Sequence, residues 1–383
     1  MLFNSLPFLF LFLPVVLIGF FVLGRFSKLA AAAFLALASF AFYGWWNPKY
    51  LLLLSGSILF NYSAGMAIAR AVAADRKAQG RRLLVLAIIA NLALLGYYKY
   101  ANFFLDNFNT LAGTGLSAGQ ILLPLGISFF TFTQIAFLVD AWQGKAREYN
   151  LVHYGLFVTY FPHLIAGPIL HHSEMMPQFA KPEIYRPDWA NLAAGATMFL
   201  IGLFKKVMIA DEIGPYGTPF FEAAQAGVAL TFVEAWCGAL AYTFQLYFDF
   251  SGYSDMAVGL SLLFGVRLPV NFHSPYKAVN MVEFWRRWHM TLSRFLRDYL
   301  YVPLGGNRKS KVRRYTNLML TMLLGGLWHG AGWTFVLWGA LHGAYLVINH
   351  AWHGLRRSLG HNLHHSSPWG RAFACLLTFA AVV

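Results

Sequence analysis

Residues 6–23 read LPFLFLFLPVVLIGFFVL, an apolar run that contains no charged side chain. A helix needs about 20 predominantly apolar residues to cross a bilayer. Neither a basic segment nor a cleavage site of small residues accompanies the run, as a signal peptide would require. We therefore predict that residues 6–24 form the first membrane span.

Comparable runs continue along the whole chain. The most regular ones lie at 30–46, 50–72, 83–105 and 121–140. Less regular ones lie near 150–170, 190–210, 228–248, 252–268, 315–329 and 333–351, and a last one begins near residue 371. Because lipid offers the backbone no hydrogen bonds, spans of this length must be helical. The sequence predicts an all-α polytopic membrane protein with roughly 11–12 spanning or re-entrant helices.

Composition supports the same class. The 383 residues are 58% hydrophobic and only 11% charged, whereas a soluble protein carries roughly a quarter charged residues. The net charge of +14 comes mostly from basic residues in short loops, where they set topology and contact anionic lipid. Membrane lipid is therefore an expected partner, and nucleic acid is not, because no soluble basic domain exists to bind it.

A second informative stretch, residues 280–306, reads NMVEFWRRWHMTLSRFLRDYLYVPLGG. Aromatic and aliphatic residues recur there at helical spacing with arginines between them, which predicts an amphipathic helix near 280–300 at the cytoplasmic interface. Its histidine, His289, lies among these aromatics. Either His289 is an interfacial residue beside its arginines or it takes part in chemistry.

A histidine of the same kind, His329, lies in LLGGLWHGAGW within an apolar run. An imidazole in an apolar environment costs free energy unless it has a partner or a function. His329 could be satisfied by a backbone carbonyl in a tight turn, and the glycines around it would let backbones or a substrate approach closely. Alternatively, two neutral imidazoles suit general acid–base work on an acyl group. His342 is a further candidate, although a packing role is commoner for such a residue.

Two carboxylates, Asp249 and Asp255, lie in the apolar segment YFDFSGYSDMAVG. Buried carboxylates need partners, so a role in orienting a histidine or arginine is plausible. The alternative is a helix break at Ser251–Gly252 with Asp255 as a solvated cap. His361, His364 and His365 resemble a metal-binding tract, but no acidic or cysteine ligand accompanies them, so we predict no metal site.

Six segments together resemble one family. They are LPLGISFFTFTQIAFLVD from Leu123, FPHLIAGPI from Phe161, YFDFSGYSDMAVG from Tyr247, LPVNFHSPY from Leu268, FWRRWHMTLSRFLRDYLYVPLGGNR from Phe284 and LWHGAGWTFVLWGALHG from Leu327. In this order they resemble the membrane-bound O-acyltransferases (MBOAT), and within them the bacterial alginate O-acetyltransferase-like branch. On this resemblance residues 1–383 form a single MBOAT membrane domain that lacks its C-terminal end.

The resemblance implies an O-acyltransferase in the bacterial inner (plasma) membrane, crossing it several times. It implies transfer of an acetyl group from a cytoplasmic thioester, acetyl-CoA, for O-acetylation of an exported polysaccharide. No bound cofactor is expected, and a separate extracytoplasmic acyltransferase partner protein is expected to finish the transfer. Two other readings stay open: D-alanyl transfer to teichoic acid from a carrier-protein thioester, and transport of a polysaccharide or lipid without acyl chemistry.

The resemblance also assigns roles to residues. His329 occupies the position of the family's catalytic histidine, and His289 that of its second functional histidine. Substrate contacts are predicted for Trp328, Arg286, Arg287 and Asp249. The two arginines would suit the phosphates of coenzyme A or of a phosphopantetheine arm, because guanidinium groups bind phosphate oxygens bidentately.

Overall fold

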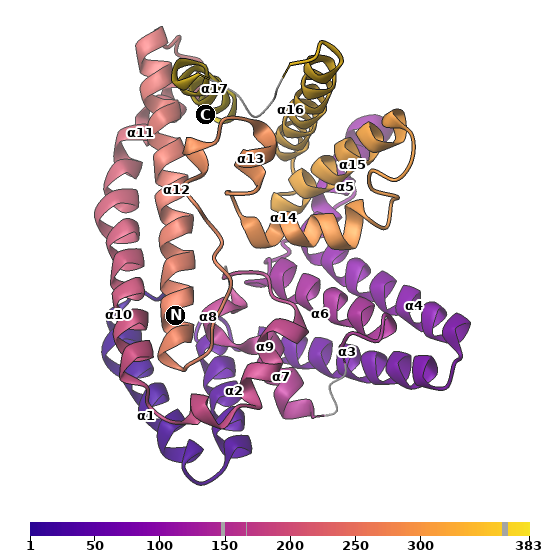
Figure 1. Ribbon diagram of the computed structural model, residues 1–383, viewed down its shortest axis with the longest axis vertical. Helices are drawn as coiled ribbons and strands as arrows, with labels where there is room; N and C mark the ends of the chain where they lie inside the picture. The colour runs from indigo at the N-terminus through magenta and orange to yellow at the C-terminus, as the bar shows by residue number, and fades with distance from the viewer. Residues whose placement is uncertain (147–149, 166, 362–366) are drawn as a thin grey trace. The chain divides into compact units, whose positions relative to one another are not determined.

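The computed structural model of the protein describes residues 1–146, 150–165, 167–361 and 367–383 (Figure 1). These residues form helices and contain no strand, which confirms the predicted all-α class. They divide into two compact units. The first unit comprises Met1–Leu95 and Leu123–Val270, and the second comprises Gly96–Leu122 and Asn271–Val383.

The first helices of the first unit are short and coincide with apolar runs of the sequence. Its helices are the π-helix η1 (Phe8–Phe12), α1 (Leu13–Gly24), α2 (Lys28–Gly44), α3 (Tyr50–Ala73), α4 (Lys77–Leu95), α6 (Ile127–Trp142), α7 (Leu151–Thr159), α8 (Phe161–Leu164), α9 (His172–Phe179), the 3₁₀-helix η3 (Pro182–Tyr185), α10 (Trp189–Phe204), the π-helix η4 (Lys205–Ala210), α11 (Asp211–Gln225) and α12 (Phe232–Leu263).

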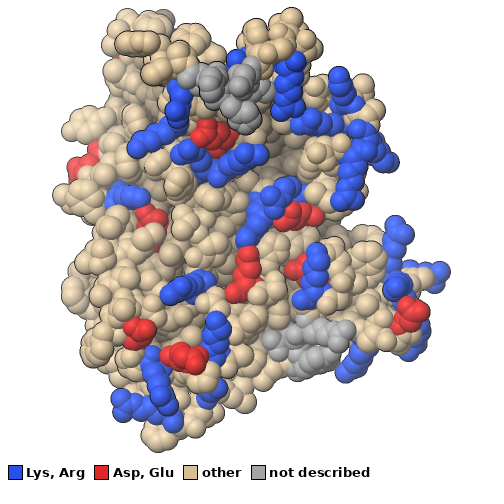
Figure 2. All heavy atoms as spheres, in the orientation of Figure 1, with Lys and Arg blue, Asp and Glu red and all other residues tan. Residues whose placement is uncertain are grey.

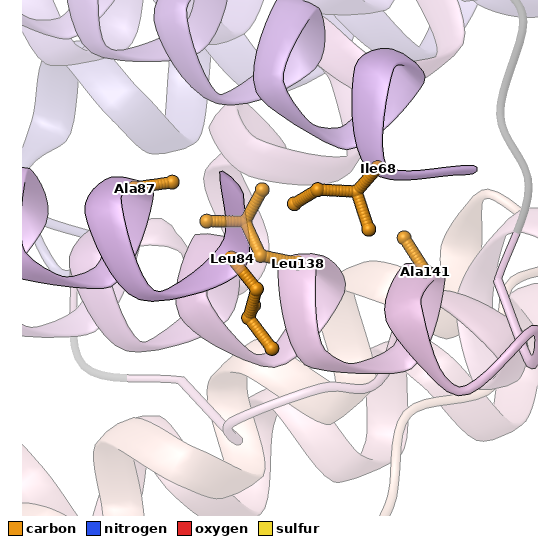
Figure 3. Packing of buried hydrophobic residues seen from close by; sticks show 5 residues of the cluster. All are labelled: Ile68, Leu84, Ala87, Leu138 and Ala141. Atoms are coloured by element: carbon orange, nitrogen blue, oxygen red, sulfur yellow. The ribbon is translucent and has the colours of Figure 1, made fainter. Parts of the chain in front are cut away.

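The helices α3, α4 and α6 pack around a small apolar core. Figure 3 shows five of its buried side chains, contributed by all three helices: Ile68, Leu84, Ala87, Leu138 and Ala141. Lipid tails are as apolar as these side chains, so close van der Waals packing stabilises such contacts between membrane helices.

Helices α10 and α12 run side by side in Figure 1 and approach closely through glycine. A Cβ added at Gly202 would lie 2.5 Å from the Gly252 carbonyl oxygen, and one at Gly195 would lie 2.8 Å from that of Gly259. The sequence predicted two separate spans, 228–248 and 252–268. This division is wrong, because the single helix α12 continues through Ser251–Gly252. Gly252 permits contact with α10 instead of breaking the helix.

In the second unit, two long helices form a hairpin, and shorter segments precede it. Its helices are the π-helix η2 (Gly96–Tyr100), α5 (Ala101–Ala112), the 3₁₀-helix η5 (Pro275–Lys277), α13 (Met281–Trp285), α14 (Met290–Leu296), the π-helix η6 (Arg297–Tyr301), α15 (Lys311–His329), α16 (Trp333–Ser358) and α17 (Pro368–Val382). The predicted amphipathic helix near 280–300 is thus helical but broken. His289 adopts a left-handed backbone conformation there and separates α13 from α14.

Three helical segments of the described chain are long and apolar enough to cross a membrane: Tyr50–Ala73, Lys77–Ala112 and Trp189–Gln225. Shorter apolar helices cover Phe8–Gly24, Lys28–Gly44, Ile127–Trp142 and Pro368–Val382. Basic side chains outnumber acidic ones on the face shown in Figure 2, in keeping with the net charge of +14.

Candidate active site

The end of α15 positions His329. Gly330 is extended, with φ −161° and ψ 152°, and ends the helix directly after His329. The last carbonyls of a helix have no partner within it. Here Tyr100 Oη donates to the Leu327 carbonyl at 2.8 Å, and Lys99 Nζ donates to the Trp328 carbonyl. Two residues of η2 therefore hold the backbone just before His329.

Helix α16 approaches α15 through glycines, as the glycine-rich sequence predicts. A Cβ added at Gly326 would overlap the Phe335 carbonyl, and one at Gly339 would overlap the Met322 carbonyl. This contact brings Trp338 of α16 beside His329, with ring centroids 5.0 Å apart and nearly perpendicular. The glycines around His329 thus serve close packing of two backbones.

His289 is 1% exposed and occupies the N-cap position of α14, with φ 42° and ψ 54°. Its Nδ1 lies 3.2 Å from Asn271 Oδ1. Burial, with a smaller contribution from His329, holds the pKa of His289 well below its usual range. The imidazole is therefore neutral near pH 7, which is the form that can accept a proton.

Five rings form a continuous row in the second unit: His289, His329, Trp338, His342 and Trp285. Successive ring centroids along this ring row are 6.5, 5.0, 4.5 and 5.3 Å apart. Among the described residues, two buried nitrogens in the row have no hydrogen-bond partner: His342 Nδ1 and Trp285 Nε1. Buried polar atoms are normally paired, so these atoms can serve a bound ligand.

A cavity of about 470 Å³ shares Trp285 with the ring row. Volumes of about 300–1,000 Å³ are typical of small-molecule sites. Its lining is apolar on one part and basic on another. The residues that line it are Val282, Trp285, Arg286, Met290, Ser293, Arg294, Leu296, Arg297, Tyr301, Leu318, Thr321, Met322, Leu346 and His350.

Three of the six predicted site residues lie together, and each of the other three has its own surroundings. His289 and His329 lie together with Trp328, whose ring centroid is 5.0 Å from that of His329 and 6.3 Å from that of His289. Arg286 lines the cavity. Arg287 instead forms a 2.6 Å ion pair with Glu283.

The remaining predicted residue, Asp249, belongs to α12 in the first unit. Its Oδ1 pairs with Lys206 at 2.6 Å. Asp255 lies inside the same helix and pairs with Lys205 at 2.5 Å, so the alternative reading of Asp255 as a solvated cap is wrong. Both carboxylates therefore pair with lysines of η4, Asp255 with its side chain 14% exposed and Asp249 with its side chain 46% exposed.

No group of three or more histidine, cysteine or carboxylate side chains in the described ranges could hold a metal ion. His361 of the predicted tract is exposed, and His364 and His365 lie outside the described residues.

Sequence reasoning did not single out Lys99, Tyr100, Asn271 or Trp338. Lys99 could have been found from the sequence, because it is the one charged residue in the apolar run 83–105. A charge within such a run costs free energy and often marks a functional residue. Asn271 and Trp338 left no such signal, since each is an ordinary residue type whose importance comes from contacts distant in the chain.

Comparisons with known proteins identify the family of this chain. The family model described as MBOAT, membrane-bound O-acyltransferase family, matches residues 143–383. The peptidoglycan O-acetyltransferase of Helicobacter pylori is 47% identical over 99% of this chain and 75% of its own length. The probable alginate O-acetylase AlgI of Pseudomonas aeruginosa is 47% identical over 92% of this chain and 66% of its own length.

A more distant relative is the teichoic acid D-alanyltransferase of Streptococcus thermophilus, 29% identical over 69% of this chain and 67% of its own length. The match therefore spans between 66% and 75% of the length of these relatives. The chain belongs to the membrane-bound O-acyltransferase family, and to the bacterial O-acetyltransferase branch within it. The protein is a membrane acyltransferase. The alternative hypothesis, a transporter without acyl chemistry, is therefore rejected.

Proposed function

We propose that this protein moves an acetyl group from cytoplasmic acetyl-CoA across the bacterial inner membrane for O-acetylation of an exported glycan. The names of the relatives support an acceptor of the alginate or peptidoglycan kind. The observation that carries the proposal is the pair of histidines, one fully buried and neutral, with ring centroids 6.5 Å apart.

The chemistry assigned to the pair is general acid–base catalysis of acyl transfer. His329 takes the proton of the acceptor hydroxyl, and the resulting alkoxide attacks the thioester carbonyl carbon. The C–S bond breaks as the new C–O bond forms. The proton held on the imidazole then goes to the departing thiolate, which leaves as free coenzyme A, and the histidine is neutral again.

The cavity beside the ring row suits the donor's phosphopantetheine arm and its phosphates. Arg286, Arg294 and Arg297 supply positive charge on one part of its wall, while Met290 and Leu346 supply an apolar part. A separate extracytoplasmic acyltransferase would complete delivery to the polymer, as the exported acceptor requires.

A carrier-protein thioester is the second candidate donor. The D-alanyltransferases among the relatives support it. A phosphopantetheine arm on a carrier presents the same thioester as coenzyme A, so the same cavity would receive it.

Release of free coenzyme A from acetyl-CoA, measured with the purified protein in nanodiscs, tests the proposal. We expect release that accelerates when a soluble glycan acceptor and an extracytoplasmic acetyltransferase are present. Well-folded protein that releases no thiol from acetyl-CoA, but discharges an acylated carrier protein, would replace the donor with the carrier thioester.

The role of the cavity is tested by Arg286→Glu. We expect a rise in KM for acetyl-CoA of about tenfold or more, because a charge-assisted hydrogen bond to phosphate contributes about 1.5–3 kcal/mol. Arg308→Glu is the matched control, since Arg308 is exposed and does not line the cavity. Equal KM values for the two variants would remove the cavity from donor binding.

A further inference from the structure

The carboxamide of Asn271 gathers three donors on one oxygen. Asn271 Oδ1 accepts from the Thr291 backbone N–H at 3.2 Å and from Thr291 Oγ1 at 3.0 Å, and it lies 3.2 Å from His289 Nδ1. A backbone N–H can only donate, so this contact identifies the atom as the carboxamide oxygen and not the nitrogen.

That identity decides the tautomer of His289. A carboxamide oxygen has no proton to give, so a hydrogen bond with His289 Nδ1 requires the proton to be on Nδ1. In a neutral imidazole the other nitrogen, Nε2, then carries the lone pair. The partner of one ring nitrogen thus determines which nitrogen can act as a base.

Asn271 is itself held in place by the chain that follows His289. The Met290 backbone N–H donates to the Asn271 carbonyl at 2.9 Å, and the His273 N–H donates to the Arg287 carbonyl at 2.9 Å. Segments 271–273 and 287–290 are therefore tied together on both sides of the imidazole contact. His289 and Asn271 are 1% exposed each, so water does not compete for the bond.

The backbone of His289 gives a second, independent observation. Its φ of 42° lies in the left-handed region that non-glycine residues seldom adopt. Such strained conformations persist where the surroundings over-determine them, and they concentrate at functional sites. Here the strained conformation lies at the N-cap of α14, where the imidazole of His289 contacts Asn271 and lies near His329.

We propose that Asn271 is a positioning residue that fixes His289 in the Nδ1–H tautomer, so that Nε2 is the ring nitrogen that offers a lone pair to the reacting groups while His329 carries the proton. The tautomer follows from the contacts of Asn271 alone, whereas its catalytic use rests on the proposed function. Among the described residues, His329 of α15 is a titratable group that lies beside His289, and Lys99 of η2 donates to the adjoining Trp328 carbonyl.

The tautomer is read directly by ¹⁵N solid-state NMR of the full chain in nanodiscs, with histidine labelled and His289 assigned by its loss in His289→Gln. We expect a protonated Nδ1 and an unprotonated Nε2 in the wild type. Asn271→Asp keeps an acceptor oxygen and should keep the tautomer. Asn271→Leu removes the acceptor and should abolish the preference for it.

The kinetic test separates positioning from mere structural support. Asn271→Leu should lower kcat by about 10–100-fold with KM for the donor unchanged, the usual effect of removing a group that orients a functional imidazole. Asn271→Asp should restore much of kcat. Its carboxylate should also raise the pKa of His289, so that the acid limb of the pH–rate profile moves to higher pH.

Thr291→Val is the matched control, because it removes another hydrogen bond to the same oxygen and leaves the Asn271–His289 contact. It should keep the wild-type tautomer and pH profile. An unprotonated Nδ1 in the wild type, or equal kcat values for wild type and Asn271→Leu, would overturn the proposal. Failure of the wild type to use acetyl-CoA would overturn the proposed donor instead, while the NMR result would stand.

Discussion

Two buried polar clusters, one in each unit, differ in whether their polar atoms have hydrogen-bond partners. In the first unit, Asn61 of α3 and Asn91 of α4 exchange two carboxamide hydrogen bonds of 3.0 and 2.7 Å. Each also donates to the carbonyl four residues earlier in its own helix, at 3.0 and 2.8 Å. In the second unit, the ring row contains two buried nitrogens that have no hydrogen-bond partner among the described residues, His342 Nδ1 and Trp285 Nε1.

The difference separates polar groups that serve the fold from those that serve a reaction. A buried polar group left without a partner costs about 1–3 kcal/mol, so we expect a bound substrate to provide partners for the two nitrogens of the ring row. The amide pair joins α3 to α4 and is complete. Two nitrogens of the ring row have no hydrogen-bond partner among the described residues, and variants in the two clusters should therefore fail in different assays.

His329→Ala should give the largest effect, a loss of turnover of about 10²–10⁴-fold, the usual contribution of general acid–base catalysis. Thermal stability should stay near that of the wild type, because Lys99 and Tyr100 bind backbone carbonyls that the substitution retains. The measurement is thiol release beside a melting curve. His353→Ala, on α16 outside the ring row, is the control, and equal turnover in the two variants would contradict the assignment.

Asn61→Leu should fail in the opposite assay. We expect a loss of about 1–3 kcal/mol in the free energy of unfolding, since Asn91 is left unsatisfied, with turnover per folded molecule unchanged. The double variant Asn61→Leu/Asn91→Leu should recover most of the loss, because it leaves no unpaired amide. A double-mutant cycle in nanodiscs measures this coupling. Additive losses would show that the amide pair does not join the helices.

His342→Phe should give the smallest effect and the sharpest comparison. The ring can still pack on Trp338, and the nitrogen without a partner disappears, so thermal stability should be equal to or slightly above that of the wild type. Turnover should fall by about tenfold, the equivalent of one hydrogen bond to substrate of about 1.4 kcal/mol. A large drop in thermal stability with normal turnover would show that His342 is a packing residue and does not contact the substrate.

Much of the fold could be predicted because lipid restricts the choices. Long apolar runs such as 50–72 must be helical, and the structure has α3 at Tyr50–Ala73. The break at Ser251–Gly252 was predicted wrongly, since a glycine that ends a helix and a glycine that admits a neighbouring helix look the same in sequence. Only the contact with Gly202 distinguishes them.

The sequence pointed to the two central histidines of the candidate site but not to the residues that contact them. His289 and His329 show themselves as costly residues in apolar sequence, and their neighbour Trp328 follows from the chain. Lys99, Asn271 and Trp338 come from segments far apart in sequence, and only tertiary packing brings them to the histidines. Arg286 and Arg287 are equivalent in composition, yet the turn after α13 directs one to the cavity and the other to Glu283.

The glycine contact between α15 and α16 has a consequence for how this site tolerates sequence drift. Main-chain atoms at Gly326 and Gly339 set the spacing of the two helices, and no side chain lies between them. The separation of His329 from Trp338 therefore does not depend on the size of the residues that cover the hairpin. Substitutions among those outer residues, for a different lipid or partner, should therefore leave the distance between these two rings unchanged.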